Sequence, residues 1–178
     1  MPYNPDLHHR RSIRLQGYDY TKIGAYFVTI CTFQREALFG DVIDGQMQLN
    51  RIGQIITSLW QAIPHHFPNV KLDEFVLMPN HLHGIVIIAK QEMQADSTNK
   101  ELVPQGTKSN SLGAIIQNFK SISTRKINRI NHNTGNPIWQ RNYYEQIIED
   151  DRTFQNIRQY ITDNPRNWQS DRLTPEHP

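Results

Sequence analysis

The stretch Met78-Pro79-Asn80-His81-Leu82-His83-Gly84-Ile85-Val86-Ile87-Ile88 decides how the rest of this chain of 178 residues is arranged. A Pro-Asn turn signal precedes a run of strand-forming residues. Successive side chains of a strand point to opposite faces, so His81 and His83 share one face while Leu82 lies on the other. Two neutral imidazoles placed in this way can bind one divalent metal ion together. The alternative is that both histidines are partly solvated residues at the start of a strand.

The composition indicates one globular domain that spans residues 1–178. Hydrophobic residues make up 37% of the chain and the formal net charge is +2, which is outside the range of disordered proteins. The single cysteine, Cys31, excludes both a disulfide framework and a Cys-rich zinc site. No stretch reaches membrane-spanning length and the N-terminus lacks the apolar segment of a signal peptide. We therefore expect a cytoplasmic protein without a membrane partner.

The spacing of apolar residues changes between a period of two and a helical period along the chain. It predicts a strand over 25–32, a small hairpin turning at Asp44-Gly45, and a helix that Asn50 caps and Pro64 ends. Strands over 70–78 and 82–89 follow, then a polar loop over 90–108, a helix over 109–131, a strand over 138–148, and a C-terminal helical segment over 150–170 that Asn164-Pro165 terminates. This order predicts an α+β fold of the ferredoxin-like or RRM-like β-α-β-β-α-β type, with a four-stranded antiparallel sheet and an added C-terminal helix.

Basic residues gather in two parts of the chain. The N-terminal arm, residues 1–22, contains Arg11 and Arg14, and no acidic residue lies between Lys108 and Arg141. A solvated charged face is the common explanation of such a run, but the lack of balancing acids favours a surface that contacts phosphates. The residues expected to contact the phosphates of a nucleic acid such as DNA are Arg11, Arg14, Lys120, Arg125, Lys126, Arg129 and Arg141.

The last predicted helix supplies a second group of polar side chains. Tyr160 and Asn164 are four residues apart, so they share one helix face. Asn164 offers an amide oxygen as a third metal ligand, and Tyr160 would then lie beside the ion as a nucleophile. Tyr160 could equally be an ordinary residue of an amphipathic helix. Tyr143 and Tyr144 compete for the nucleophile's role, and we prefer Tyr160 because a tyrosine on a terminal helix is withdrawn more easily after reaction.

Four motifs in this order resemble those of the single-tyrosine HUH transposase family, and most closely its REP-associated tyrosine transposase branch. They cover nearly the whole chain and are found at 24–32, 78–84, 139–144 and 160–165. The resemblance assigns the His-hydrophobic-His motif to His81 and His83, the nucleophile to Tyr160 and the third metal ligand to Asn164. It implies a bacterial enzyme, nucleoid-associated when bound to DNA, that works as a monomer or a homodimer.

By this resemblance, the reaction is cleavage and rejoining of single-stranded DNA at a hairpin through a 5′-phosphotyrosine intermediate, which results in DNA transposition. The implied cofactor is Mg²⁺ or Mn²⁺, although two imidazoles alone would favour zinc or manganese. Two alternatives remain at this point. One is a single-stranded nucleic-acid-binding module without catalysis, because the same topology is common among RNA-binding proteins. The other is a metal-dependent phosphoesterase in which water is the nucleophile.

Overall fold

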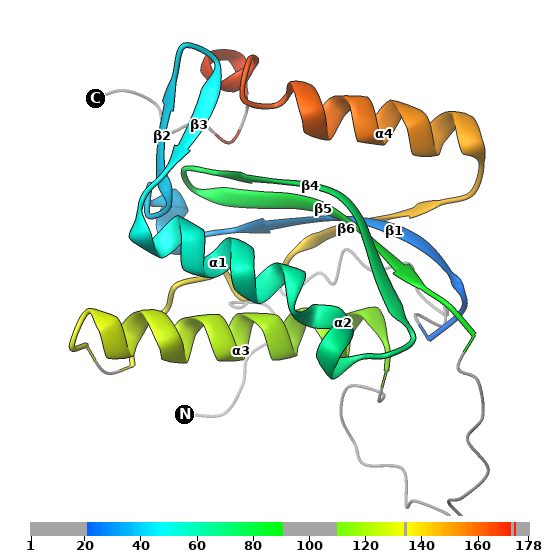
Figure 1. Cartoon of the computed structure of the whole chain (residues 1–178), viewed down its shortest axis with the longest axis horizontal. Helices are drawn as coiled ribbons and strands as arrows, with labels where there is room; N and C mark the ends of the chain where they lie inside the picture. The colour runs from blue at the N-terminus through cyan, green and yellow to red at the C-terminus, as the bar shows by residue number, and fades with distance from the viewer. Residues whose placement is uncertain (1–20, 91–109, 134, 172, 174–178) are drawn as a thin grey trace, which may run out of the picture.

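Four antiparallel strands form the central sheet, in the order β4-β5-β1-β6 (Figure 1). Their bounds are β1 Gly24–Cys31, β4 Val70–Met78, β5 His81–Ile88 and β6 Tyr144–Ile148. The computed structural model describes residues 21–90, 110–133, 135–171 and 173. Residues 1–20 of the N-terminal arm, with Arg11 and Arg14, and the predicted loop over 90–108 except for its first residue, lie outside these ranges. The predicted α+β fold with a four-stranded antiparallel sheet is confirmed.

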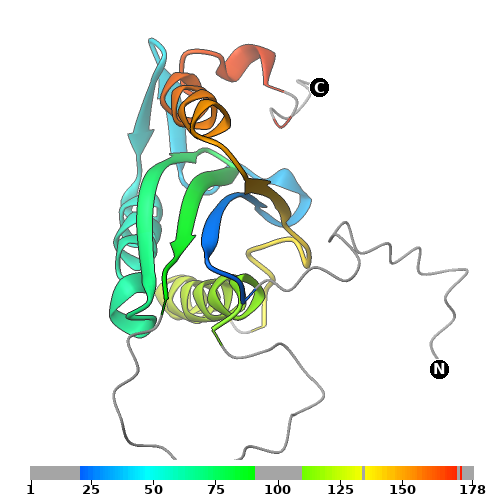
Figure 2. The ribbon, with the colours of Figure 1, turned by 90° about the vertical axis from the view of Figure 1, so that its right-hand side faces the viewer.

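Helices cover both faces of the sheet, so the molecule has three layers (Figures 1 and 2). The helices α1 (Arg51–Gln61), α2 (Ile63–His66) and α3 (Leu112–Ile130) pack on one face, and α4 (Asp151–Asp163) packs on the other. A separate hairpin consists of β2 (Gly40–Ile43) and β3 (Gln46–Leu49), and two short 3₁₀ helices are η1 (Phe33–Arg35) and η2 (Trp168–Ser170). Within the described ranges, no helix is both long and apolar enough to cross a bilayer.

The alternation of side chains along β1 and β5 divides the interior into two apolar clusters. On the α1/α3 side, Tyr26, Val28 and Leu82 belong to the larger cluster. On the α4 side, Phe27 and Ile85 pack with residues of α4 in the smaller one. Antiparallel pairing places Thr29 opposite His83 and Cys31 opposite His81. Thr29 of β1 and the two histidines at the start of β5 therefore lie on the face that α4 covers.

Gly84 allows β5 to lie close to the helical layer. A Cβ at this position would lie 2.7 Å from Cζ2 of Trp60, a distance that real Cβ atoms do not adopt. Trp60 is fully buried and packs with Phe119 at 5.1 Å between ring centroids. The glycine after His83 thus fixes the depth at which this strand packs, and with it the position of the histidine pair.

Polar side chains cap the N-termini of α1 and α4 by accepting hydrogen bonds from backbone amides of the first turn. Asn50 accepts a hydrogen bond from the Gly53 amide at 2.9 Å, as predicted. Asp150 accepts one from the Thr153 amide at 2.8 Å, and hydrogen bonds from Thr153 lower the pKa of this carboxyl. The cap at Asp150 sets where α4 begins, and so where Tyr160 lies along it.

Three predicted boundaries differ from the structure. Pro64 does not end helical structure, because it occupies the first turn of α2, where its missing N–H costs no hydrogen bond. Ile138 and Trp139 precede β6 as buried core residues, so the strand is shorter than 138–148. The helix ends at Asp163, so the predicted stop at Asn164-Pro165 is confirmed, but a 3₁₀ turn follows and the segment 150–170 is therefore not one helix.

Candidate active site

The two histidines at the start of β5 lie side by side on the face that α4 covers. Their ring centroids are 4.5 Å apart. His81 is 0% exposed and His83 is 2% exposed, so neither is the partly solvated surface residue of the alternative interpretation. The predicted placement of the pair, with Leu82 buried on the opposite face, is confirmed.

Asn80 determines which nitrogen of His81 carries the proton. The Asn80 amide nitrogen donates to the carbonyls of Leu173 at 2.7 Å and Arg35 at 3.1 Å. Its Oδ1 is therefore the atom that faces His81, and it accepts a hydrogen bond from Nδ1 at 2.8 Å. Nε2 of His81 keeps its lone pair, and among the described residues this buried atom has no hydrogen-bond partner.

His83 is held between a strand and a helix. Its Nδ1 lies 2.8 Å from the Thr29 hydroxyl on β1, and its Nε2 lies 3.2 Å from the Tyr160 hydroxyl on α4. The Phe27 ring stacks on the imidazole at 5.4 Å between centroids. Because Nδ1 contacts Thr29, Nε2 is directed toward α4. In this orientation His83 can bind a metal ion or accept a hydrogen bond through Nε2.

Burial keeps both imidazoles neutral at pH 7. It lowers the pKa of His81 to about 4, with the Asp171 carboxylate acting in the opposite direction. It also lowers the pKa of His83 well below the ordinary value, and the neighbouring His81 adds to this effect. Neutral imidazoles are the form that binds metal ions.

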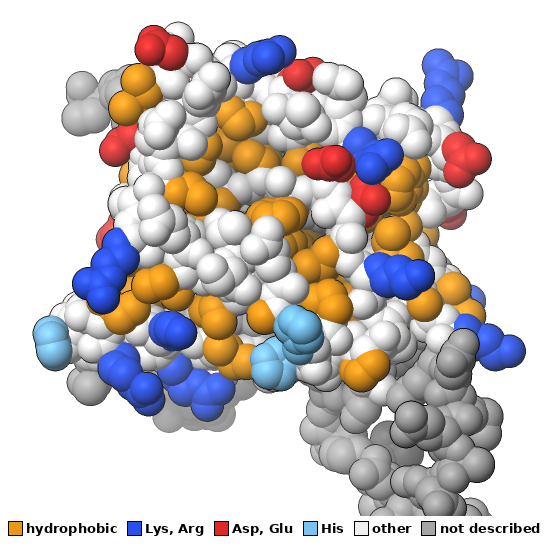
Figure 3. Space-filling model, viewed as in Figure 1, with side chains coloured by type: hydrophobic (Ala, Val, Ile, Leu, Met, Phe, Trp, Pro, Cys, Tyr) orange, Lys and Arg blue, Asp and Glu red, His pale blue; other side chains and the backbone are white. Residues whose placement is uncertain are grey.

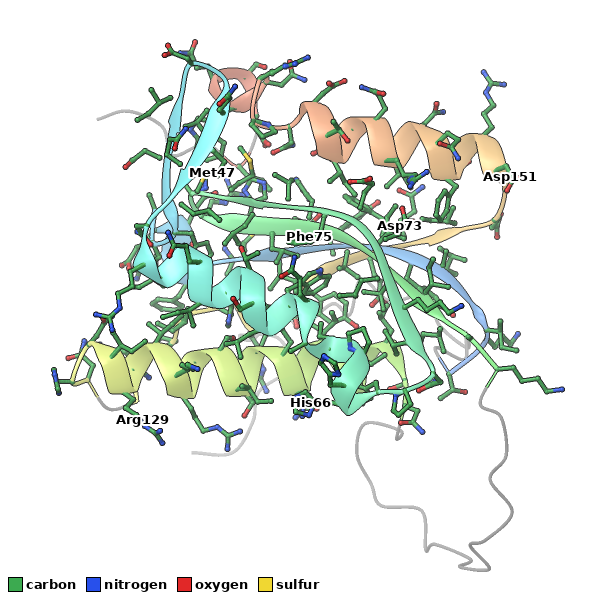
Figure 4. The ribbon with its side chains drawn as sticks, viewed as in Figure 1. Met47, His66, Asp73, Phe75, Arg129 and Asp151 are labelled. Atoms are coloured by element: carbon green, nitrogen blue, oxygen red, sulfur yellow. The ribbon has the colours of Figure 1, made fainter. Side chains whose placement is uncertain are left out.

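Two kinds of contact hold α4 in the position that brings Tyr160 to His83. Ile157 and Ile161 pack in the smaller apolar cluster against the sheet. Arg158 Nε lies 2.8 Å from Oδ1 of Asp73, which projects from β4 toward α4 (Figure 4). Tyr160 remains 47% exposed, so its hydroxyl is accessible from solvent. Burial of its ring and the Asp171 carboxylate raise the pKa of Tyr160, although Asn164 opposes them.

Asn164 and Asp171 complete the polar group around the histidines. Asn164 is 2% exposed, and its Nδ2 lies 3.2 Å from Oδ2 of Asp171. The carboxylate fixes the amide orientation, so Asn164 presents an Oδ1 that has no hydrogen-bond partner among the described residues. The same Asp171 oxygen lies 3.9 Å from His81 Nε2.

These residues fit a divalent metal ion. His81, His83 and Asp171 each offer a ligand atom, and the three atoms lie within 4.8 Å of one another. His81 Nε2 is buried without a hydrogen-bond partner among the described residues, and Asn164 Oδ1, also without one, is a further possible ligand atom at the same place. Asp171 did not emerge from the sequence because it lies outside every motif and beyond the end of α4. Its carboxylate adds the hard oxygen ligand that two imidazoles lack.

A pocket of about 680 Å³ opens beside His83 and Tyr160. Tyr144 on β6 lines it, whereas Tyr143 packs against the larger apolar cluster on the other side of the sheet. The two tyrosines thus face opposite ways, as predicted for neighbours near a strand, and Tyr143 lies on the wrong face to act with the histidines. Of the pair, only Tyr144 lies beside the candidate site.

Of the basic residues proposed from sequence, the five that the structure describes do not line this pocket. Arg125, Lys126 and Arg129 are exposed on α3, in the layer on the opposite face of the sheet. Figure 3 shows Lys and Arg side chains along the lower edge of the molecule over α3, and Figure 4 shows Arg129 there. Arg141 is also exposed.

Lys120 differs from the other basic residues of α3. Its Nζ donates to the carbonyls of Gln140 at 3.0 Å and Asn142 at 2.9 Å, and it lies over the Tyr143 ring at 5.4 Å. The ammonium group therefore holds the segment before β6 in place. This contact gives Lys120 a structural role that the sequence did not reveal.

Comparison with known proteins agrees with the fold. A family model of IS200-like transposases matches residues 92–164, a range that includes Tyr160 and Asn164. An uncharacterized protein of Haemophilus influenzae is 44% identical over 178 residues, which covers 96% of each chain. A solved REP-associated tyrosine transposase bound to a REP hairpin has the same fold, with a TM-score of 0.59 at 18% identity over 88% of this chain and 74% of that chain.

The family model that matches this chain describes transposases, which are DNA-processing enzymes. The chain belongs to the IS200-like transposase family.

Proposed function

We propose that the protein cleaves and rejoins single-stranded DNA at hairpin sequences, with Tyr160 as the nucleophile, and that it belongs to the REP-associated branch of its family. The observation that carries this proposal is the 3.2 Å contact between the Tyr160 hydroxyl and His83 Nε2, at the open side of a buried histidine pair. A hydroxyl on a half-exposed side chain, next to imidazoles that can bind a metal ion, suits attack on a phosphodiester.

The proposed step conserves phosphodiester bonds. The Tyr160 oxygen forms a bond to phosphorus, the bond between phosphorus and the 3′ oxygen breaks, and the 5′ phosphate remains on the protein. The proton lost by the phenol is balanced by the proton that the leaving 3′ oxygen gains. Attack by another 3′ hydroxyl reverses the step, so joining needs no external energy source.

The raised pKa of Tyr160 means that the phenol is protonated at pH 7 and needs help to react. We expect His81, His83 and the oxygens of Asn164 and Asp171 to hold Mg²⁺ or Mn²⁺. When bound, a divalent ion would polarise the phosphate, orient it for in-line attack and favour the phenolate. Because Asn80 Oδ1 accepts from Nδ1 of His81, the Nε2 lone pair of His81 is available at this position, and the Thr29 contact at Nδ1 of His83 directs the second Nε2 toward it.

The proposed partner is a single-stranded DNA hairpin. The relative in fold carries a REP hairpin, and exposed Arg125, Lys126, Arg129 and Arg141 offer cations for phosphates. Arg11 and Arg14 in the N-terminal arm are proposed for the same role. One chain supplies both imidazoles and the phenol, so the proposal holds for a monomer or a homodimer, associated with the nucleoid while bound to DNA.

Trapping a covalent adduct tests this function directly. The protein is incubated with Mn²⁺ and a single-stranded hairpin labelled at its 3′ end, and the products are separated on a denaturing gel. We expect a labelled band shifted by the mass of the protein, because the 5′-phosphate side of the break carries the label. Cleavage without a shifted band would mean that water is the nucleophile. Binding without cleavage would mean that the protein is a nucleic-acid-binding module.

A further inference from the structure

The β6 side of the pocket presents two exposed side chains whose role the cleavage step does not explain. Tyr144 and Gln146 lie two residues apart on β6, so they project from the same face, and both line the pocket. Tyr144 is 49% exposed. Among the five large hydrophobic side chains that are exposed in the described part of the chain, only Tyr144 and Tyr160 line this pocket.

An apolar surface joins these two tyrosines. The Phe27 ring, which is 6% exposed, meets Tyr144 edge-on at 6.3 Å and Tyr160 edge-on at 6.0 Å between centroids. Ile157 of α4 also lines the pocket. The Tyr144 ring meets Phe27 in an edge-to-face contact, and the residue still exposes 49% of its surface beside the pocket. An aromatic ring with exposed surface therefore lies next to the nucleophile.

The charges around the pocket favour binding of an uncharged group against β6. No Lys or Arg is among the described residues that line it, and the carboxylate present is that of Asp171. A phosphate would find no cation against Tyr144 and Phe27, whereas a nucleobase is neutral and has a flat π face. Gln146 adds an amide, which has a donor side and an acceptor side that can pair with the edge of a base.

From this geometry we infer that the unpaired base flanking the scissile phosphate stacks on Tyr144 and has its edge read by Gln146. The inference rests on the proposed function, because it names a subsite for the same DNA strand. Stacking of the base on Tyr144, beside Tyr160, positions the neighbouring phosphate for attack. The Gln146 amide makes cleavage selective for the identity of the stacked base. Tyr144 is thus a substrate-binding residue and Gln146 a specificity residue.

Binding of simple single strands without chemistry tests the inference. A fluorescein-labelled oligothymidylate and an abasic strand of the same length are titrated with protein in excess EDTA, and fluorescence anisotropy gives Kd. We expect Tyr144→Ala to weaken oligothymidylate binding by about 5-fold to 100-fold and to leave the abasic strand unaffected. Tyr144→Phe keeps the ring and should bind as the wild type does. Phe33→Ala is the matched control, because Phe33 is 40% exposed and does not line the pocket.

Gln146 is tested with homopolymers of different bases. The wild type should distinguish oligoadenylate, oligocytidylate and oligothymidylate, and Gln146→Ala should bring their Kd values together while Tyr144 still supplies stacking. The inference would be overturned if Tyr144→Ala lost affinity equally for the base-containing and the abasic strand. It would also be overturned if Gln146→Ala kept the base preference of the wild type. If the wild type binds no single strand at all, the proposed function itself fails, which is a separate outcome.

Discussion

The hydroxyl of Tyr160 lies 3.2 Å from Nε2 of His83, although 77 positions separate the two residues in the chain. One belongs to α4 and the other to β5, so the contact depends on how α4 packs against the sheet. The apolar contacts of Ile157 and Ile161, together with the ion pair between Arg158 and Asp73, set that packing. The proposed nucleophile therefore reaches the histidines through tertiary structure, and the predictions below follow from this arrangement.

The first prediction concerns the nucleophile. Tyr160→Phe keeps the ring, which packs edge-on against Phe27, and loses only the hydroxyl. The variant should fold and bind a DNA hairpin as the wild type does, yet form no covalent adduct on a denaturing gel. Tyr143→Phe is the matched control and should keep the adduct, because Tyr143 packs on the other side of the sheet. An adduct formed by Tyr160→Phe would show that another residue attacks.

The second prediction concerns the metal ligands. Asp171→Asn and His81→Ala should each weaken Mn²⁺ binding, measured by isothermal titration calorimetry without DNA, by more than about 10-fold, because each removes one of the proposed ligands. Asp163→Asn is the control, since its carboxylate at the end of α4 accepts a hydrogen bond from Gln159 instead. Equal Mn²⁺ affinity in Asp171→Asn and the wild type would remove Asp171 from the ligand set. In that case Asn164→Ala should show the loss.

The third prediction concerns acid stability in the absence of metal. The pKa of His81 falls from 6.5 in the unfolded chain to about 4 in the folded protein. The unfolded state therefore takes up a proton first as the pH drops, so the stabilisation present above pH 6.5 is lost as the pH falls toward 4. His81 alone should cost about 2 kcal/mol of unfolding free energy by about pH 5. His83 acts in the same direction.

Urea unfolding in EDTA at about pH 7.5 and about pH 5 measures this loss. His81→Gln should reduce the difference between the two conditions, whereas His66→Gln, which changes an exposed histidine on α2, should leave it unchanged. The same pH dependence in His81→Gln and the wild type would mean that other groups cause the acid destabilisation.

The fourth prediction distinguishes the role of the exposed basic residues of α3 from that of Lys120. Replacing exposed Arg125, Lys126 and Arg129 together with Gln should weaken hairpin binding and reduce the slope of log Kd against log salt concentration by up to ~3, about one per phosphate contact. Lys120→Gln should leave that slope unchanged and instead lower the free energy of unfolding by about 1–2 kcal/mol, because it removes hydrogen bonds to two carbonyls. A salt titration that shows no change for the triple variant would place DNA elsewhere.

The fifth prediction concerns Gly84. Gly84→Ala would bring a methyl group to 2.7 Å from Trp60, so it should cost about 1–3 kcal/mol in unfolding free energy through overpacking. A second substitution that shortens the side chain at position 60, Trp60→Phe, should recover part of the loss when combined with it. Additive losses in the double variant would show that the two positions are not coupled.

The sequence by itself determined the fold class and the local geometry of the histidine pair. Strand periodicity requires His81 and His83 to share a face, and helical periodicity requires the same of Tyr160 and Asn164, since both patterns are properties of a single element. Its error at Pro64 arose because proline fits the first turn of a new helix. Its error over 138–148 arose because long-range contacts, such as the Lys120 ammonium with the carbonyls before β6, decide the local structure there.

Only the tertiary structure decided how these elements meet. It brings Asp171 to the histidines from beyond α4, selects Tyr144 over Tyr143 as the tyrosine beside the pocket, and gives each imidazole its Nδ1 partner in Asn80 or Thr29. It also separates the basic face of α3 from the pocket by the thickness of the sheet. The physical reason is that a periodic pattern fixes the face on which a side chain lies, whereas the neighbour across that face is fixed only when the layers pack.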